Sequence, residues 1–318
     1  AAPAAGSATV SATPKPLEVA AAPLQPAAAH GPECVLLGAL CALAAAMSML
    51  LSQQPGAVAT LWLANAVAMG FLATSPRRRW PALLASVLAG NLAANLLLGF
   101  KPLTAMAVLP AHGAEVLIGA ALLRRAGLAR TGLRTPLAML KLFALGAFGP
   151  QLVGATLGAA TMQALGLGTF PSLWQNWYEG SALGSISALA LVIAWRVDRA
   201  ELLRRDLLDW RVPIIGMVAV GVTLLSLSHV PFPFVYIAIP LLLAAIVLEM
   251  TAALMVVLAT SLVVALSLAT GVFVPPPITA QWQQLFVYTA YAAALLPAQL
   301  LAAAVADMRD SHERLAAA

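Results

Sequence analysis

Two ionisable side chains lie in the middle of an apolar stretch, where a charge is costly. His112 and Glu115 are three residues apart, so they share one face of a helix. At the centre of a membrane helix a charged side chain costs about 2.5–3.5 kcal/mol, so each needs a partner or a function. Asn65, Asn91 and Asn95 lie at comparable depths on neighbouring apolar stretches. These side chains predict a buried polar ligand pocket or a proton-sensing pair, or alternatively a hydrogen-bonded network that fixes helix packing.

Aromatic residues gather around a second carboxylate, at the predicted outer end of a later apolar stretch. They are Trp174, Trp177 and Tyr178, and they are followed by Glu179. Aromatic side chains at this depth are typical of the membrane interface. The alternative is an aromatic mouth anchored by Glu179, which would suit a cationic or hydroxyl-bearing ligand.

The sequence offers too few candidate ligands to bind a metal ion or a cofactor. His112 and Glu115 would need further partners to complete a four-ligand site. His30, Cys34 and Cys41 share a helical face, but two small thiols in an apolar helix are typical of packing. We therefore expect no bound metal, no cofactor and no catalytic residue.

The composition specifies what kind of element must position these residues. Of the 318 residues 62% are apolar and only 9% are charged, and the mean hydropathy is +0.92. A soluble domain spends about 25% of its residues on charge, so this chain cannot cover its own surface in water. Alternating strands of a membrane barrel are not apparent either. The sequence predicts an all-α polytopic bundle in the lipid bilayer.

About ten apolar segments are long enough to cross a bilayer, with eight or nine as alternative counts. They cover residues 34–52, 57–74, 80–99, 103–123, 137–163, 174–195, 212–228, 234–250, 252–270 and 282–306. Residues 1–33 are rich in alanine and proline and predict a flexible tail. Residues 34–306 form the membrane domain, and 307–318 the start of a helical connector to a cytoplasmic domain further along the chain.

Arginine placement predicts the orientation. All fourteen arginines fall on one side when the loops are assigned alternately, against the single loop lysine Lys101 on the other side. Positive residues in short loops stay cytoplasmic, so both termini are expected inside. The net charge of +5 is thus a topology signal, and a nucleic-acid partner is excluded.

Small residues and prolines predict how the helices pack and bend. The glycine pairs should let the fifth and sixth segments cross closely, and the prolines are candidate hinges. The glycines are Gly154, Gly158, Gly180 and Gly184, and the prolines are Pro150, Pro240 and Pro297.

Several motifs, in order over residues 61–315, resemble the first-type membrane-associated sensor domain of the MASE family. The motifs are Trp62-Leu-Ala-Asn65-Ala-Val-Ala, Pro76-Arg-Arg-Arg-Trp80-Pro81, Asn91-Leu-Ala-Ala-Asn95, the stretch from Glu115 to Arg125, the stretch from Trp174 to Gly184, and Phe232 to Leu243. Two positions depart from the family pattern: Ser181 stands in place of an aspartate, and His112 in place of an asparagine or threonine.

The resemblance implies a sensory input in the inner membrane of a bacterium. Such domains precede histidine kinase, diguanylate cyclase or cyclic-di-GMP phosphodiesterase outputs, so this segment is expected to be non-enzymatic and homodimeric. Its stimulus would be a small ligand, the state of the membrane or a second membrane protein. The alternative is a secondary transporter in which Glu115, Glu179 and His112 are the coupling residues.

Overall fold

The computed structural model is a bundle of helices and describes residues 31–51, 61–128, 132–197, 209–273 and 280–317. The predicted flexible tail therefore lies outside the described residues, except for its last three residues, which begin the first helix. The helices are α1 (Gly31–Leu50), α2 (Leu63–Thr74), α3 (Trp80–Leu97), α4 (Pro102–Ala107), α5 (Leu109–Arg125), α7 (Pro136–Leu142), α8 (Gly149–Ala164), α9 (Phe170–Val197), α11 (Arg211–His229), α12 (Pro233–Val247), α13 (Met250–Ala269) and α14 (Ala280–Ala317). The all-α prediction is confirmed.

Each of the ten predicted segments corresponds to a helix or to a pair of consecutive helices. Among the described residues, eight are long and apolar enough to cross a membrane. The other two, α2 and α12, are apolar but have only 12 and 15 residues. The chain is therefore a multi-pass membrane protein.

Two of the predicted segments are interrupted. The fourth is split at Val108 into α4 and α5, and Pro110 stands in the first turn of α5. This break was not predicted, although Pro110 removes a helical hydrogen-bond donor there. The fifth segment contains a π-helical stretch, Phe143–Phe148, just before Gly149 and Pro150. By contrast, α12 and α14 continue through Pro240 and Pro297.

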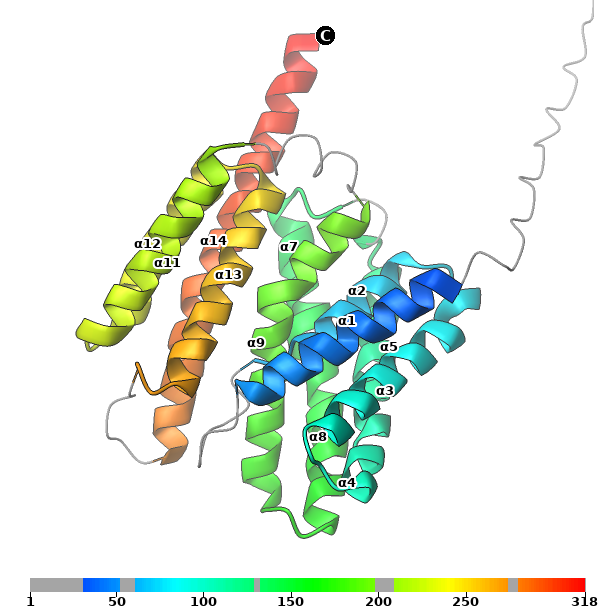
Figure 1. Cartoon of the computed structure of the whole chain (residues 1–318). Helices are drawn as coiled ribbons and strands as arrows, with labels where there is room; N and C mark the ends of the chain where they lie inside the picture. Colours follow the sequence, from blue (N-terminus) through cyan, green and yellow to red (C-terminus); the bar gives the residue numbers. More distant parts are fainter. Residues whose placement is uncertain (1–30, 52–60, 129–131, 198–208, 274–279, 318) are drawn as a thin grey trace, which may run out of the picture.

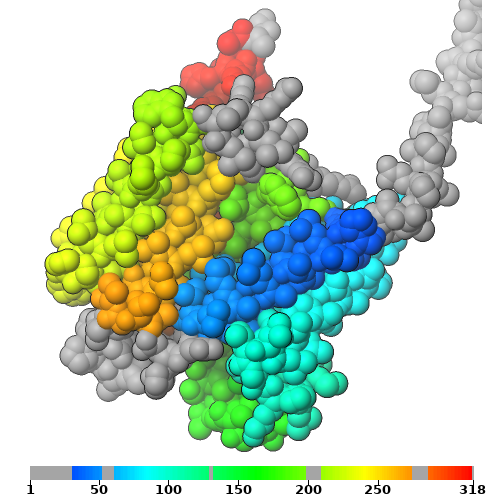
Figure 2. Space-filling view, in the orientation of Figure 1, coloured from blue at the N-terminus to red at the C-terminus, as the bar shows by residue number. Residues whose placement is uncertain are grey.

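Helix α9 is the centre of the bundle and the most deeply buried of the long helices. It packs against α2 and α8 on one side and against α13 and α14 on the other. The first helices, with α1 lying obliquely across the front, form one half, and α11 to α14 form the other (Figure 1). In the space-filling view α1 is a ridge on the surface (Figure 2), and it crosses α3 where Gly38 and Gly90 let the two backbones meet.

The glycines of α9 do not serve the predicted crossing with α8. A side chain at Gly184 would collide with the backbone of Trp62, and the Trp62 amide donates to the Gly180 carbonyl at 2.9 Å. The groove on α9 therefore receives the start of α2. On α8, Gly158 does face α9, where it lies against the Trp177 ring, but Gly154 faces Glu115 of α5. The prediction was wrong about the partner because spacing along one helix does not specify which neighbour fills the groove.

Helix α14 projects from one end of the bundle, which we call the connector end (Figure 1). Glu33 forms ion pairs with Arg79 at 3.1 Å and with Arg196 at 2.8 Å. Arg124 donates to the carbonyl oxygen of Ser75 at 2.8 Å and so caps the end of α2. These contacts tie the ends of α1, α2, α5 and α9 together.

The projecting part of α14 is held at the same end by two residues in succession. Arg309 donates to the carbonyl oxygen of Ile246 at 2.9 Å and forms an ion pair with Glu249 at 3.1 Å, just past the end of α12. Asp310 pairs with Arg134 at 3.0 Å, in the segment before α7. The helix continues to Ala317 without interruption, so the predicted connector and the last predicted span form one continuous helix.

Candidate functional site

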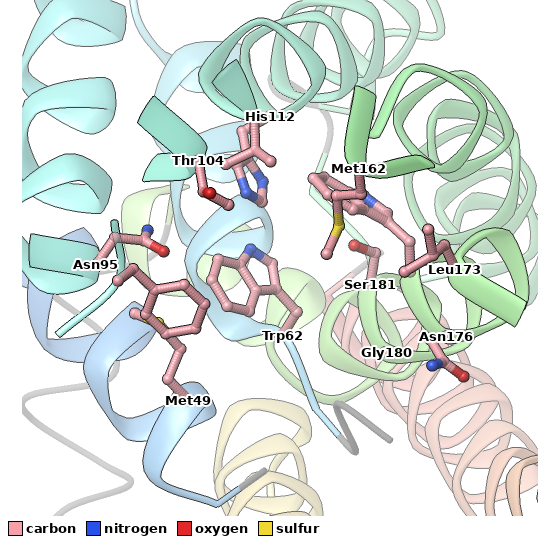
Figure 3. Close-up of a pocket in the computed structure, with 13 residues that line it drawn as sticks. Met49, Trp62, Asn95, Thr104, His112, Met162, Leu173, Asn176, Gly180 and Ser181 are labelled. Atoms are coloured by element: carbon pink, nitrogen blue, oxygen red, sulfur yellow. The ribbon is translucent and has the colours of Figure 1, made fainter. Parts of the chain in front are cut away.

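A cavity of about 430 Å³ lies between α2, α5 and α9 (Figure 3). Its lining includes Trp62 just before α2 and His112 in the first turns of α5, so it lies away from the connector end. Met49, Asn95, Phe100, Thr104 and Val108 from α1, α3, α4 and the turns beside them form one wall. Trp62 and His112 lie beside it, and α8 and α9 close the other side. The residues contributed by α8 and α9 are Met162, Leu173, Asn176, Trp177, Gly180 and Ser181. The volume suits a small molecule.

His112 is held between two indole rings. Its ring centroid lies 5.1 Å from that of Trp62, with 15° between the planes, and 4.7 Å from that of Trp177, with 31° between the planes. The side-chain amide of Asn65 donates to His112 Nδ1 over 3.2 Å. An amide N–H can only donate, so this bond requires that His112 Nδ1 carries no hydrogen. Three helices thus fix the orientation of this ring.

Glu115 lies directly behind the cavity wall and has no exposed surface. The indole Nε1 of Trp177 donates to its Oε2 at 3.2 Å, and the Ser181 hydroxyl donates to the same oxygen at 3.5 Å. Gly154 of α8 makes room for it, because a side chain there would collide with the carboxylate. Two residues that line the cavity therefore also hold the buried carboxylate.

The predicted direct pair of His112 and Glu115 is replaced by an indirect link. Both residues contact Trp177, one through its ring face and the other through its Nε1. Asn65 forms a hydrogen bond with His112, and its side chain also interacts with Glu115. The polar cluster therefore joins α2, α5 and α9, rather than closing on α5 alone.

Among the described lining residues of the cavity there is no lysine or arginine, and three aromatic rings and the amides of Asn95 and Asn176 are part of the lining. Such a site can bind a small ligand by stacking and a few hydrogen bonds. In the part of the chain that the structure describes, no group of three residues is placed to hold a metal ion.

The structure brings some of the predicted site residues together and separates others. Asn95 lines the cavity, whereas Asn91 is buried nearby without lining it. Of the predicted aromatic mouth only Trp177 belongs here. The other members, Trp174, Tyr178 and Glu179, lie on the opposite face of α9.

Glu179 is also deeper than predicted. It is 8% exposed, not at a hydrated outer rim, because α9 begins at Phe170 and Glu179 falls in its third turn.

Several lining residues were not among the predicted sensing candidates. Trp62 and Ser181 stood in the family-like motifs, but nothing in their own chemistry marked them as a site. Phe100 and Thr104 were missed because the break between α4 and α5, which positions α4 at the cavity, was missed. Pro110 was the signal that could have indicated it.

The fold and this cavity define a polytopic membrane protein with a small-molecule-sized site among its helices. Residues 34–308 match the model of the MASE1 family, so the chain belongs to that family and is a membrane sensory domain. A curated relative is the probable diguanylate cyclase DgcE of Escherichia coli (strain K12), which is 25% identical over 236 residues. The match covers 74% of this chain but 21% of the relative, so the chain spans about a fifth of that protein's length. No solved structure matches significantly.

Proposed function

We propose that this sensory domain responds to a small molecule that binds in the cavity between Trp62, His112 and Trp177. The observation that carries the proposal is the double role of Trp177 and Ser181, which line the cavity and also bond Glu115. A ligand that displaces either side chain changes the partners of a fully buried carboxylate. Because a buried polar group without a partner is costly, such a change favours a different packing of α9 against α5.

The signal would travel along α9 to α14. Gln299 of α14 donates to the carbonyl oxygen of Ile186 at 2.9 Å. Ile186 is five residues beyond Ser181, about 7.5 Å along the helix. Arg309 is ten residues beyond Gln299, about 15 Å further. A shift of α9 thus has a short path to the connector end.

The output would be cytoplasmic and of the diguanylate cyclase kind, as the similarity to DgcE suggests. The domain itself would be non-enzymatic. The arginine-rich connector end would face the cytoplasm of a bacterium, and the cavity would open near the outer face of its inner membrane. We further propose that the domain works as a homodimer, because the outputs of this sensor class act as dimers. Membership of a sensor family favours this function over transport.

The experiment is to fill the cavity from its wall. Thr104→Trp places an indole into the cavity from α4, whereas Met106→Trp adds the same group on the exposed face of that short helix. Each variant is fused to a diguanylate cyclase reporter, and cyclic-di-GMP is measured at equal membrane levels. We expect Thr104→Trp to fix the output at one level and Met106→Trp to leave it at the wild-type level. Equal outputs for both variants would contradict the proposal.

A further inference from the structure

A second cavity, of about 720 Å³, lies on the other face of α9, where this helix faces α14. Its α9 residues recur from Phe170 to Ile186, about 24 Å of helix, so the cavity is an elongated groove. Across from them are Tyr288, Thr289 and Ala292 of α14, and Phe148 at the end of the π-helical stretch. Most of this lining is apolar. The groove is separate from the cavity at His112, which lies across α9.

One carboxylate interrupts the apolar lining. Glu179 is 8% exposed, and Gln175 Nε2 donates to its Oε1 at 2.9 Å. Tyr288, which is 7% exposed, interacts electrostatically with it from α14. Among the described lining residues there is no lysine or arginine. Glu179 is therefore the one acidic side chain among the described lining residues, and the complementary ligand group is a cation that donates hydrogen bonds.

An aromatic pair completes the surroundings of this carboxylate. The rings of Trp174 and Tyr178 are stacked with centroids 5.0 Å apart and 7° between their planes. Trp174 is held in place because its Nε1 donates to the Thr156 hydroxyl of α8 at 3.1 Å. Both rings line the groove. Aromatic faces beside a carboxylate are the surroundings that bind organic cations.

The position of the groove indicates that its ligand comes from the membrane. Glu179 lies nine residues after Phe170, about 14 Å along α9 and so within the depth of a bilayer. Thr289, at the edge of the groove, is exposed on a membrane-spanning part of α14. A molecule that enters here passes through lipid.

We propose that this groove binds a membrane-partitioned amphiphile, with its apolar chain along α9 and a cationic amine head at Glu179. Such a ligand contacts α9 and the connector helix α14 at once. It is a second input to the sensor, and it does not depend on what binds near His112.

The test uses the protein in nanodiscs of phosphatidylcholine and the probe N-(4-bromobenzyl)dodecylamine, whose bromine lies close to the amine and quenches tryptophan fluorescence at short range. N-(4-bromobenzyl)dodecanamide and 4-bromobenzyl dodecyl ether, which are neutral, are the matched probes. We expect saturable quenching with the amine alone, since neither matched head carries a positive charge. Trp174→Phe should remove most of the saturable part.

Two variants test the site itself. Glu179→Gln should weaken half-saturation about tenfold or more, which is the effect of losing about 1.4 kcal/mol of binding. Thr289→Leu, at the lipid-exposed edge, narrows the groove without changing a buried residue. It should also weaken half-saturation, and it tests the site if Glu179→Gln fails to fold. Glu313→Gln, which removes an exposed carboxylate from the last turns of α14, should leave half-saturation unchanged.

Quenching that is equal for the three probes, or half-saturation unchanged by both groove variants, would overturn the proposal. The assay does not measure cytoplasmic output, so its result is independent of the function proposed for the other cavity.

Discussion

At the scale of single residues, the site depends on which groups donate hydrogen bonds to a buried carboxylate. Glu115 has no exposed surface, and two of its hydrogen-bond donors, Trp177 and Ser181, come from α9. A group that links α5 to α9 in this way is a packing element and, in the proposed function, a point of control. The same two donors are part of the cavity wall, so a ligand bound there would compete with the carboxylate for them.

Substitutions at Glu115 separate these two roles. Glu115→Gln keeps the shape and one acceptor oxygen, so we expect wild-type membrane levels but an output fixed at one extreme. Glu115→Ala leaves the donors of Trp177 and Ser181 unpaired and should cost about 1–3 kcal/mol, seen as a lower thermal midpoint. Glu313→Gln, at an exposed position of α14, is the control. Wild-type output and stability in both Glu115 variants would show that this carboxylate has no role.

The sequence predicts the polar members of the site better than its apolar wall. His112, Glu115 and Asn65 are visible because ionisable and amide groups are costly in an apolar stretch. Glu179 and Ser181 are two residues apart, about 200° around a helix, so their separation onto opposite faces of α9 follows from helical geometry. Which helix covers each face does not follow, because it depends on long-range packing.

At the scale of the elements, the close approach of α2 to α9 positions Trp62 at the cavity. The start of α2 rests on Gly180 and Gly184, where only a missing side chain allows backbone contact. The sequence predicted this small-residue groove but assigned it to α8. It also predicted the helix continuing past the last span, since no glycine or proline stands there to end it.

The small-residue groove at Gly180 and Gly184 of α9 allows a direct test of how α2 packs. Gly184→Leu should destabilise the domain more than Ala188→Leu, because a side chain at Gly184 meets the backbone of Trp62, which cannot move aside cheaply. Overpacking of this kind costs about 1–3 kcal/mol or more. Purified yield and thermal midpoint are compared for the two variants. The opposite ranking would mean that α2 does not lie in this groove.

The contacts at the connector end predict a charge-exchange effect. Arg309→Glu breaks the ion pair with Glu249 and should change basal output in the reporter fusion, because α14 loses its attachment to the end of α12. The double variant Arg309→Glu with Glu249→Arg restores the opposite charges and should restore part of the output. Arg314→Glu, on the exposed last turns, is the control. If the control variant changes output as much as Arg309→Glu, the effect is one of net charge.

At the scale of the whole molecule, the two ends of the bundle differ in the kind of side chains that they carry. Ion pairs of Glu33, Glu249 and Asp310 with arginines lie at the connector end, while the aromatic cavity lies toward the other. This polarity agrees with the arginine rule, which predicts that the connector end is cytoplasmic.

Cysteine labelling tests that orientation. In a background without Cys34 and Cys41, a cysteine at Lys101 should react with an impermeant maleimide added to intact cells. A cysteine at Arg78 should react only after permeabilisation, because it lies beside the connector end. Both side chains are exposed, so accessibility within the protein is matched. The reverse pattern would invert the topology and place the cavity toward the cytoplasm.

The most direct test of the account is whether filling the cavity moves α14. Spin labels at Leu315, which is 76% exposed, and at the exposed Arg78 report the distance between α14 and the turn before α3. Pulsed electron paramagnetic resonance is recorded for the protein in nanodiscs. We predict that Thr104→Trp shifts the main distance by about 2 Å or more, as helix shifts in signalling proteins do, and that Met106→Trp leaves it unchanged. Identical distance distributions for Thr104→Trp and the wild type would contradict the claim that this cavity controls the connector helix.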